Sequence, residues 1–374
     1  MNKICVYAIC KNESKFVDRW YNSMSEADCI VVLDTGSTDD TVEKLRSHGV
    51  TVVQKAIEPW RFDVARNESL KLVPSDCNIL VCTDLDEYFD EGWAKYLRER
   101  WIEGVHKRCH YSYYYANLDT GLPEQIIIYN KIHGRGWHWR CPVHELMAKD
   151  SDGNEDLSGN EILYLVDEIM LHHTPDIKKS RSNYLDLLEI RRKENPTDYF
   201  GLYYMALDYE HDYHNYQKAI EVLEDALKVC DDGYYTFMIT GKIGMLQKKN
   251  GNNEVALVYL KKAISSCDEY RFLILESADI LFYYYKDYNG AYNMLLHGLK
   301  STFQHDYWYE QPYGWGSEYY DLLSLSAFYC GKTVESLIYA LIAQNKDKNN
   351  ERYKNNIEII KNSITEIDIK NYEE

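Results

Sequence analysis

The chain has 374 residues, with 42 basic and 60 acidic side chains and a formal net charge of −18. This length is enough to bury a large core and predicts two domains, or one domain with an appendage. Hydrophobic residues make up 45% and charged residues 27% of the sequence, which excludes a disordered chain. The negative balance argues against a protein that mainly binds nucleic acid, because neutralising phosphates requires an excess of lysine and arginine.

The N-terminal sequence, MNKICVYAICKNESKF, runs from a short apolar stretch directly into charged residues. It is expected to be a first β-strand and not a signal peptide. No apolar run reaches the roughly 18 residues that a membrane helix needs. Ten cysteines lie between Cys5 and Cys330 without a CxxC pair. We therefore expect free thiols in a reducing cytosol and a cytoplasmic protein.

Up to about residue 175, short apolar runs alternate with helical segments. The apolar runs predict strands over 4–10, 29–34, 50–56, 78–84, 125–130 and 162–171. The segments between them predict helices over 14–25, 38–48, 64–72 and 92–101. This alternation favours an α/β domain of the Rossmann-like class with a mostly parallel sheet. In such sheets ligands bind beyond the carboxyl ends of the strands, so chemistry is expected just after each strand.

After about residue 178 the pattern becomes helical and repeats itself. The motif Ala-x3-Leu-x2-Ala, or Gly in the last unit, begins at Ala219, Ala256 and Ala291. The units lie about 35 residues apart, near the 34-residue tetratricopeptide period. Further helices are expected over 317–329, 334–345 and, as a polar cap, 350–367. We therefore predict a domain over 1–178 and an all-α, tetratricopeptide-like solenoid over 179–374.

The strongest local motif follows a buried strand, where the string NILVCTDLDE carries Asp84 and Asp86. Two carboxylates at i and i+2 in extended backbone project from one face, about 7 Å apart. A core does not tolerate such a pair unpaired. Paired carboxylates suit a hard divalent cation such as Mg²⁺ or Mn²⁺, whereas a solvated acidic turn is the plain alternative.

A second motif ends the strand over 29–34, in the string IVVLDTGSTDDT. Gly36 permits a tight turn, and the Ser, Thr and Asp residues that follow suit the start of a helix. A capped turn explains residues 37–41 but does not explain the acid at position 34. Asp34 is therefore expected to accept hydrogen bonds from a base or a ribose.

Several motifs occur in an order that resembles family 2 glycosyltransferases of the GT-A fold. They are Asn12-Glu13, the LDTGSTDDT string, Ala65-Arg66-Asn67, DLDE, Gly92-Trp93, GWHWRCPVHE over 136–145 and His172-His173. With the helical repeats that follow, the chain looks like the bacterial and phage subgroup that fuses such a domain to tetratricopeptide-like repeats. Bacterial peptide S-glycosyltransferases share this architecture.

The resemblance implies a nucleotide-sugar donor, with UDP as the expected nucleotide, and a Mn²⁺ or Mg²⁺ cofactor. Asp34 would contact the nucleotide and Arg66 would lie near its base or diphosphate. Asn12 and Glu13 belong to the same implied donor site. Asp86 would ligate the metal, and Asp84 would reach the ribose or a metal-bound water. His172 would complete the metal site, with His173 as the alternative.

Inverting transfer needs a general base on the acceptor side. Glu145 in the Pro-Val-His-Glu segment is the candidate that the resemblance implies, with His144 beside it. Only one of the two is expected to enter the site, since neighbouring side chains on a strand point to opposite faces. This chain has His-Glu where many relatives have an Asp-containing motif. Glu145 is equally suited to a salt bridge with Arg140 or Arg135.

Three further patterns leave alternatives open. The Tyr111–Tyr115 run and the Trp137/Trp139 pair suit either a stacking wall for a sugar or an ordinary core. A zinc site from Cys109, His133, His138, Cys141 and His144 matches no standard spacing. The basic stretch suits a solvated helix face or a site for an anion; it comprises Lys178, Lys179, Arg181, Arg191, Arg192 and Lys193.

The sequence therefore predicts a metal-dependent, inverting glycosyltransferase whose helical repeats position the acceptor or mediate self-association. The concave surface of the repeats is expected to carry aromatic residues of the types that often anchor protein interfaces, although the same types also fill cores between helices: Tyr203, Tyr204, Tyr283, Tyr284, Trp308 and Trp315. The expected acceptor is a protein, peptide or glycan, and a nucleic-acid acceptor is less favoured by the overall charge. The competing hypotheses are a nucleotidyltransferase and a non-catalytic tetratricopeptide scaffold with a degenerate transferase domain. The former lacks a Gly-rich basic loop after the first strand, and intact Asp34, Asp84 and Asp86 argue against the latter. The sugar is not predicted.

Overall fold

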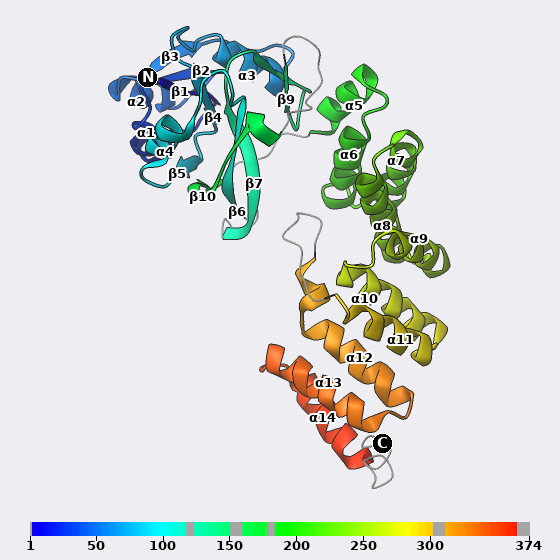
Figure 1. Cartoon of the computed structure of the whole chain (residues 1–374). Helices are drawn as coiled ribbons and strands as arrows, with labels where there is room; N and C mark the ends of the chain where they lie inside the picture. The colour runs from blue at the N-terminus through cyan, green and yellow to red at the C-terminus, as the bar shows by residue number, and fades with distance from the viewer. Residues whose placement is uncertain are drawn as a thin grey trace. The chain divides into compact units, whose positions relative to one another are not determined.

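The structure is a computed structural model that describes residues 2–116, 123–149, 159–176, 178, 184–301 and 311–364. The chain divides into two compact units, Met1–Glu194 and Asn195–Glu374 (Figure 1). The sequence analysis placed this boundary after residue 178. The structure places it later because the helix that follows is bonded to the first unit.

The first unit is built on a mixed sheet whose strands follow the order β3-β2-β1-β4-β7-β6-β10-β5. The pairs β1–β2, β2–β3, β1–β4 and β6–β10 are parallel, and the pairs β4–β7, β6–β7 and β5–β10 are antiparallel. The strands are β1 (Ile4–Cys10), β2 (Cys29–Asp34), β3 (Thr51–Gln54), β4 (Ile79–Thr83), β5 (Glu87–Phe89), β6 (Arg108–Ala116), β7 (Pro123–His133) and β10 (Ile162–His173).

In the described residues of the first unit, the sheet is accompanied by α-helices and by a small antiparallel pair of strands. The pair consists of β8 (Trp137–Arg140) and β9 (Leu146–Lys149). The helices are α1 (Val17–Met24), α2 (Thr41–Ser47), α3 (Phe62–Leu70), α4 (Trp93–Arg100) and α5 (Leu185–Glu194), and a single 3₁₀ turn spans Gly159–Glu161. The predicted α/β class is confirmed, and each strand and helix predicted before residue 175 is present.

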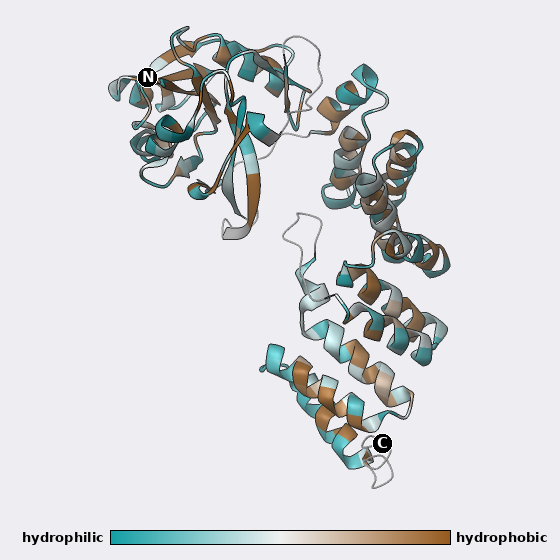
Figure 2. Cartoon of the chain, viewed as in Figure 1, coloured by the Kyte–Doolittle hydropathy of each residue, from teal (hydrophilic) through white to brown (hydrophobic). Residues whose placement is uncertain are grey.

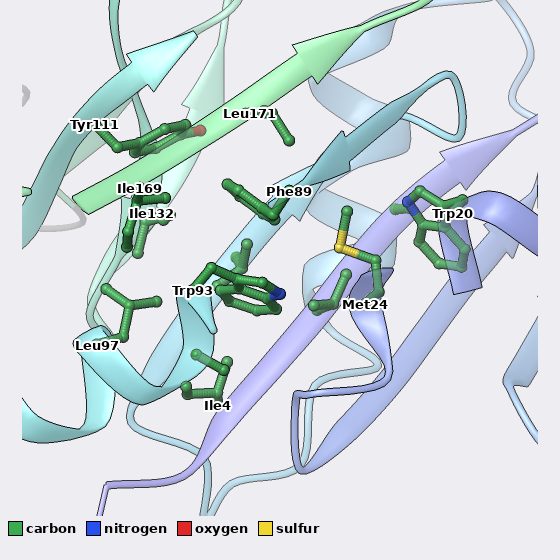
Figure 3. Close-up of a cluster of buried hydrophobic side chains, with 14 of the residues drawn as sticks. Ile4, Trp20, Met24, Phe89, Trp93, Leu97, Tyr111, Ile132, Ile169 and Leu171 are labelled. Carbon is green, nitrogen blue, oxygen red and sulfur yellow. The ribbon is translucent and has the colours of Figure 1, made fainter. Parts of the chain in front are cut away.

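The main core fills the space between the sheet and the helices α1 and α4 (Figure 3). Trp20 and Met24 of α1 and Trp93 and Leu97 of α4 are its central helix residues, and all four are at most 1% exposed. The two indoles also satisfy their polar atoms, since Trp20 donates to Thr83 at 3.0 Å and Trp93 donates to the Ser23 carbonyl at 3.0 Å. Burial of these large side chains stabilises the packing of β4 and β5 against α1.

The second unit consists of antiparallel helix pairs. They are α6 (Tyr199–His211) with α7 (Tyr216–Val229), α8 (Gly233–Lys249) with α9 (Asn253–Ser266), α10 (Arg271–Asp279) with α11 (Tyr288–Gly298), and α12 (Ser317–Tyr329) with α13 (Thr333–Lys346), followed by α14 (Glu351–Ser363). The repeated small and leucine positions of α7, α9 and α11 are buried, and Ala219, Ala256 and Ala291 are 0% exposed. The predicted tetratricopeptide-like solenoid is confirmed, and its helices carry hydrophobic and hydrophilic positions in alternation (Figure 2).

Two features of the second unit differ from the expectation. A π-helix, Ile280–Tyr285, continues α10, and a 3₁₀ turn, Pro312–Trp315, precedes α12. Tyr203 was expected on the binding surface but is 3% exposed, whereas Tyr283 and Tyr284 are each 49% exposed. The expected surface residue Trp308 lies outside the described residues.

Candidate functional site

The expected site residues follow strands whose carboxyl ends meet at one edge of the sheet. Cys10 at the end of β1 pairs with Asp34 at the end of β2, and Ala8 pairs with Thr83 at the end of β4. The turns after β1, β2 and β4 therefore lie side by side, as the parallel arrangement predicts.

Asp34 is buried at 0% exposure, and its carboxylate receives several hydrogen bonds. The backbone N–H groups of Gly36 and Ser37 donate at 3.2–3.3 Å, and Gln54 Nε2 donates at 3.2 Å. Burial alone would raise the pKa of Asp34, but these donors outweigh burial and lower it below its usual range. Asp34 thus shapes the turn before α2 as an ionised group.

Asn12 and Glu13 hold the turn after β1 against the turn after β2. Asn12 adopts a left-handed backbone conformation, with φ of 57°. Its side-chain oxygen accepts from the Thr38 N–H at 2.7 Å, and the Glu13 N–H donates to Thr41 at 2.9 Å. These contacts place both residues beside Asp34 and make the two turns one continuous surface.

Arg66 on α3 lies buried between two acidic side chains. Its Nη1 and Nη2 donate to the two carboxylate oxygens of Asp84 at 3.0 and 3.1 Å, and its Nε donates to Glu145 at 2.8 Å. Lys131 of β7 adds its ammonium at 3.2 Å from Asp84. Burial would raise the pKa of Asp84, but Arg66 and Lys131 together hold it well below its usual range.

Glu87 is the next carboxylate in this network and is 2% exposed. It accepts from the Asp84 N–H at 2.8 Å and from the Tyr113 hydroxyl at 3.2 Å. Burial, opposed by Lys131 and reinforced by Asp84 and Asp86, raises the pKa of Glu87 to about 7. Glu87 therefore fixes the turn that carries Asp84 and Asp86.

Asp86 faces His173 and not His172. Oδ2 of Asp86 lies 3.5 Å from Nε2 of His173, the last residue of β10. His172 points elsewhere, because its Nε2 lies 2.9 Å from Asp90 and its ring stacks on Tyr88. The other ring nitrogen of His173 is buried and has no hydrogen-bond partner among the described residues.

Asp86 and His173 fit a hard divalent cation. They offer one carboxylate oxygen and one imidazole nitrogen near the carboxyl edge of the sheet, and no lysine or arginine forms an ion pair with Asp86 among the described residues. Asp84 differs, since Arg66 and Lys131 occupy both of its oxygens.

The two predicted base candidates, Glu145 and His144, have different partners. Glu145 pairs with Arg66 and not with Arg140 or Arg135. The ring of His144 lies 6.0 Å from the ring of Tyr184, measured between centroids. Burial, with Arg191 adding to it, lowers the pKa of His144 to about 4. His144 is therefore neutral at physiological pH, and its side chain is partly buried.

Burial favours a core role for most of these aromatic residues. Tyr111, Tyr113, Trp137 and Trp139 are each at most 5% exposed and belong to two buried hydrophobic clusters, whereas Tyr114 and Tyr115 are partly buried. Neither indole is thus an exposed stacking surface. Both nitrogens of His133 are engaged, by the Tyr7 hydroxyl at 2.7 Å and the Gly134 carbonyl at 2.7 Å, which removes it from the suggested zinc set.

The basic stretch is only partly a solvated face. Arg191 is 2% exposed, and its Nη1 donates to the carbonyls of Val143 and His144 at 3.1 and 2.9 Å. Glu194, at the end of α5, is paired with Arg61. These bonds join α5 to the segment that carries Glu145. Lys179 and Arg181 lie outside the described residues.

Sequence reasoning missed three residues of the site. Lys131 and Gln54 lie at the ends of strands, and Glu87 follows the Asp-Leu-Asp string directly. An isolated lysine that ends an apolar strand, as in QIIIYNK, was the available signal for Lys131, because a buried ammonium requires carboxylate partners.

Residues 5–167 match the family described as Glycosyl transferase family 2. The first unit carries a family 2 glycosyl transferase domain. The match includes Asp34, Arg66, Asp84, Asp86 and Glu145 and ends before His172 and His173. No curated protein matches the sequence.

Solved structures with some likeness to part of this chain include MamA, YrrB and PilF of Pseudomonas aeruginosa. MamA is 15% identical, with a TM-score of 0.36 over 44% of this chain and 86% of its own. YrrB, described as a TPR protein with an unusual peptide-binding site, is 13% identical, with a TM-score of 0.36 over 46% of this chain and 80% of its own. PilF is 14% identical, with a TM-score of 0.37 over 46% and 70%. In the described parts of the chain, no helix is long and apolar enough to cross a membrane.

Proposed function

We propose that this protein is a metal-dependent, inverting glycosyltransferase that uses a nucleotide sugar, with UDP as the nucleotide. The observation that carries the proposal is the pairing of Asp86 with His173, beside an Asp84 that Arg66 and Lys131 keep ionised. The match of residues 5–167 to family 2 glycosyl transferases supports the proposal at the level of the reaction class.

In this proposal Asp86 and His173 hold Mn²⁺ or Mg²⁺. When bound, the cation offsets the negative charge that develops on the leaving diphosphate. Two donor atoms of Arg66 and one of Lys131 hold the carboxylate of Asp84 in place. There it would contact the ribose or a metal-bound water. Asp34 and the turn held by Asn12 form the adjoining surface for the base.

Glu145 has a different role here from the general base that the sequence suggested. Its carboxylate accepts the Nε–H of Arg66 at 2.8 Å, so one of its oxygens is engaged by a buried guanidinium. We assign it as a positioning residue that, together with Asp84, fixes the buried guanidinium. The ring of His144 is partly buried and contacts the ring of Tyr184, so His144 is not assigned to the chemistry either.

The helical unit is proposed to bind a protein or peptide acceptor. A cavity of about 200 Å³ lies there among α10, the π-helix and α12, and its lining contains Glu276, Asp279, Glu318, Asp321, Tyr283 and Tyr313. Lys248 pairs with Glu276 and Asp279 at 2.7 Å each. Arg352 also pairs with Asp321 at 2.8 Å. The four carboxylates outnumber these two cations, so charge complementarity favours a basic acceptor segment. π-Helical turns occur frequently at functional sites.

The test is release of nucleoside diphosphate from a panel of nucleotide sugars, with Mn²⁺ and with a chelator. We expect one UDP-sugar to yield UDP only with the metal. UDP at 100 times its dissociation constant should also stabilise the folded protein by about 2.7 kcal/mol. Equal melting temperatures across all nucleotides and metals would contradict the proposal.

A further inference from the structure

Three cysteine thiols meet at the amino-terminal edge of the sheet, away from the turns that carry Asp84 and Asp86. They belong to Cys5 in β1, Cys29 at the start of β2 and Cys77 in the turn before β4. Their sulfur atoms all lie within 4.8 Å of one another. Among the residues that the structure describes, this is the one group of three or more His, Cys, Asp or Glu ligand atoms at such spacing.

The backbone holds the three thiols in place. Cys5 and Cys29 are direct partners in the parallel pairing of β1 with β2. The turn that contains Cys77 is bonded to β1 through the Lys3 carbonyl, which accepts from Asn78 and Ile79 at 3.1 Å each. Arg135 secures the same turn by donating to the carbonyls of Cys77 and Pro74.

The spacing suits a shared metal ion better than a disulfide. The Cys29 and Cys77 sulfurs are 3.7 Å apart, and all ten cysteines are free thiols. Two thiolates bound to one tetrahedral zinc at about 2.3 Å are separated by about 3.8 Å. A disulfide would require about 2.05 Å between the sulfurs.

Ordinary core packing accounts for only part of this arrangement. Cys5 and Cys77 are buried beside apolar neighbours such as Leu80 and Met147, where a thiol acts as a small hydrophobe. Packing does not require three sulfurs from three segments to converge, nor Cys29 to remain half-buried at the surface. A half-buried thiol gives an ion access and leaves a position for water.

We propose that Cys5, Cys29 and Cys77 bind a thiophilic divalent ion of the zinc type through three thiolates, with water as the fourth ligand. Binding releases the thiol protons to solvent, and the guanidinium of Arg135 offsets part of the remaining negative charge. The ion ties β1, β2 and the start of β4 together. The three sulfur ligands of this site favour a soft or borderline metal. The carboxylate of Asp86, at the carboxyl edge of the sheet, favours a hard metal.

The experiment titrates the full chain, reduced and under anaerobic conditions, with Co²⁺ as the spectroscopic probe. We expect one equivalent to give thiolate-to-metal charge-transfer absorption, and one equivalent of Zn²⁺ to abolish it by displacement. A hard-ligand site cannot produce these bands, because they require a metal–sulfur bond. Absence of charge-transfer absorption at stoichiometric Co²⁺ would overturn the proposal.

Four variants locate the site. Cys29→Ser and Cys77→Ser should each weaken Co²⁺ binding at least 10-fold while keeping the size of the side chain. The matched control is Cys267→Ser, which changes a partly buried thiol in the other unit and should leave the titration unchanged. Asp86→Asn should also leave it unchanged. Bands that persist in the folded Cys29→Ser and Cys77→Ser proteins, or vanish in Asp86→Asn, would refute the three-thiolate site.

Discussion

The guanidinium of Arg66 donates to both carboxylate oxygens of Asp84, at 3.0 and 3.1 Å, while Asp86 two residues later has no such partner. The two acids of the Asp-Leu-Asp string are therefore not equivalent. One is held by buried cations, and the other faces a histidine. This difference determines what each substitution should do.

Asp86→Asn should reduce turnover by at least about 10–100-fold, the loss typical even of groups that only support a metal ligand. The fold should persist, because Asp86 contributes one contact at 3.5 Å to His173. Metal-dependent release of UDP and the melting temperature measure the two effects. Near-normal Mn²⁺-dependent release by this variant would contradict the assignment of Asp86.

Asp84→Asn should lower stability as well as activity. It removes a charge that pairs with Arg66 and Lys131, which are 6% and 12% exposed at their side chains. Leaving buried charged donors poorly paired costs about 1–3 kcal/mol or more. Chemical denaturation compares it with Asp86→Asn. Unfolding of both variants at the same denaturant concentration would contradict a stabilising pairing of Asp84 with Arg66 and Lys131.

His173→Ala and His172→Ala form a matched pair of neighbouring substitutions. The first should weaken Mn²⁺ activation by about 10–100-fold, since it removes the ring that faces Asp86. The second should change it little, because His172 is engaged with Asp90 and Tyr88. The measurement is the Mn²⁺ concentration that gives half-maximal activity. The reverse order of effects would assign the metal to His172.

Glu145→Gln tests positioning against base catalysis. The amide oxygen of glutamine still accepts from Arg66 Nε, so a positioning role predicts that most activity remains. A general base would instead contribute about 10²–10⁴-fold, and glutamine would be as inactive as alanine. The comparison of Glu145→Gln with Glu145→Ala therefore separates the roles, with the pH profile of kcat as a second readout.

Stability should fall in mild acid because of His133. Burial is the largest cause that lowers its pKa to about 4, so the folded protein keeps it neutral while the unfolded chain protonates it near pH 6.5. The contribution of neutral His133 to the free energy of unfolding is complete above pH 6.5 and is lost as the pH falls toward 4. At pH 5 the loss is about 2 kcal/mol. Melting curves of the native protein and His133→Gln between pH 7 and 5 measure it; parallel curves would contradict it.

The sequence predicted the elements well because they depend on local patterns. Alternating apolar runs located β1, β2 and β4, and the repeated alanines located α7, α9 and α11. The partners of buried charges were not predictable, because Arg66 and Glu145 are 79 positions apart and three arginines were available to Glu145. The burial of Tyr203 was not predictable from its residue type, because α6 is apolar around most of its circumference and buries this tyrosine together with Leu202.

The attachment of α5 to the first unit has a consequence for how such proteins diversify. Arg191 bonds the carbonyls of Val143 and His144, so the helix before the repeats braces the segment that carries Glu145. A natural seam therefore lies at Asn195–Pro196, after this brace and before α6. Recombination at that seam would supply one transfer domain with different repeat arrays. Under the proposed function, acceptor choice would then change by exchange of whole segments, while the proposed nucleotide site is retained.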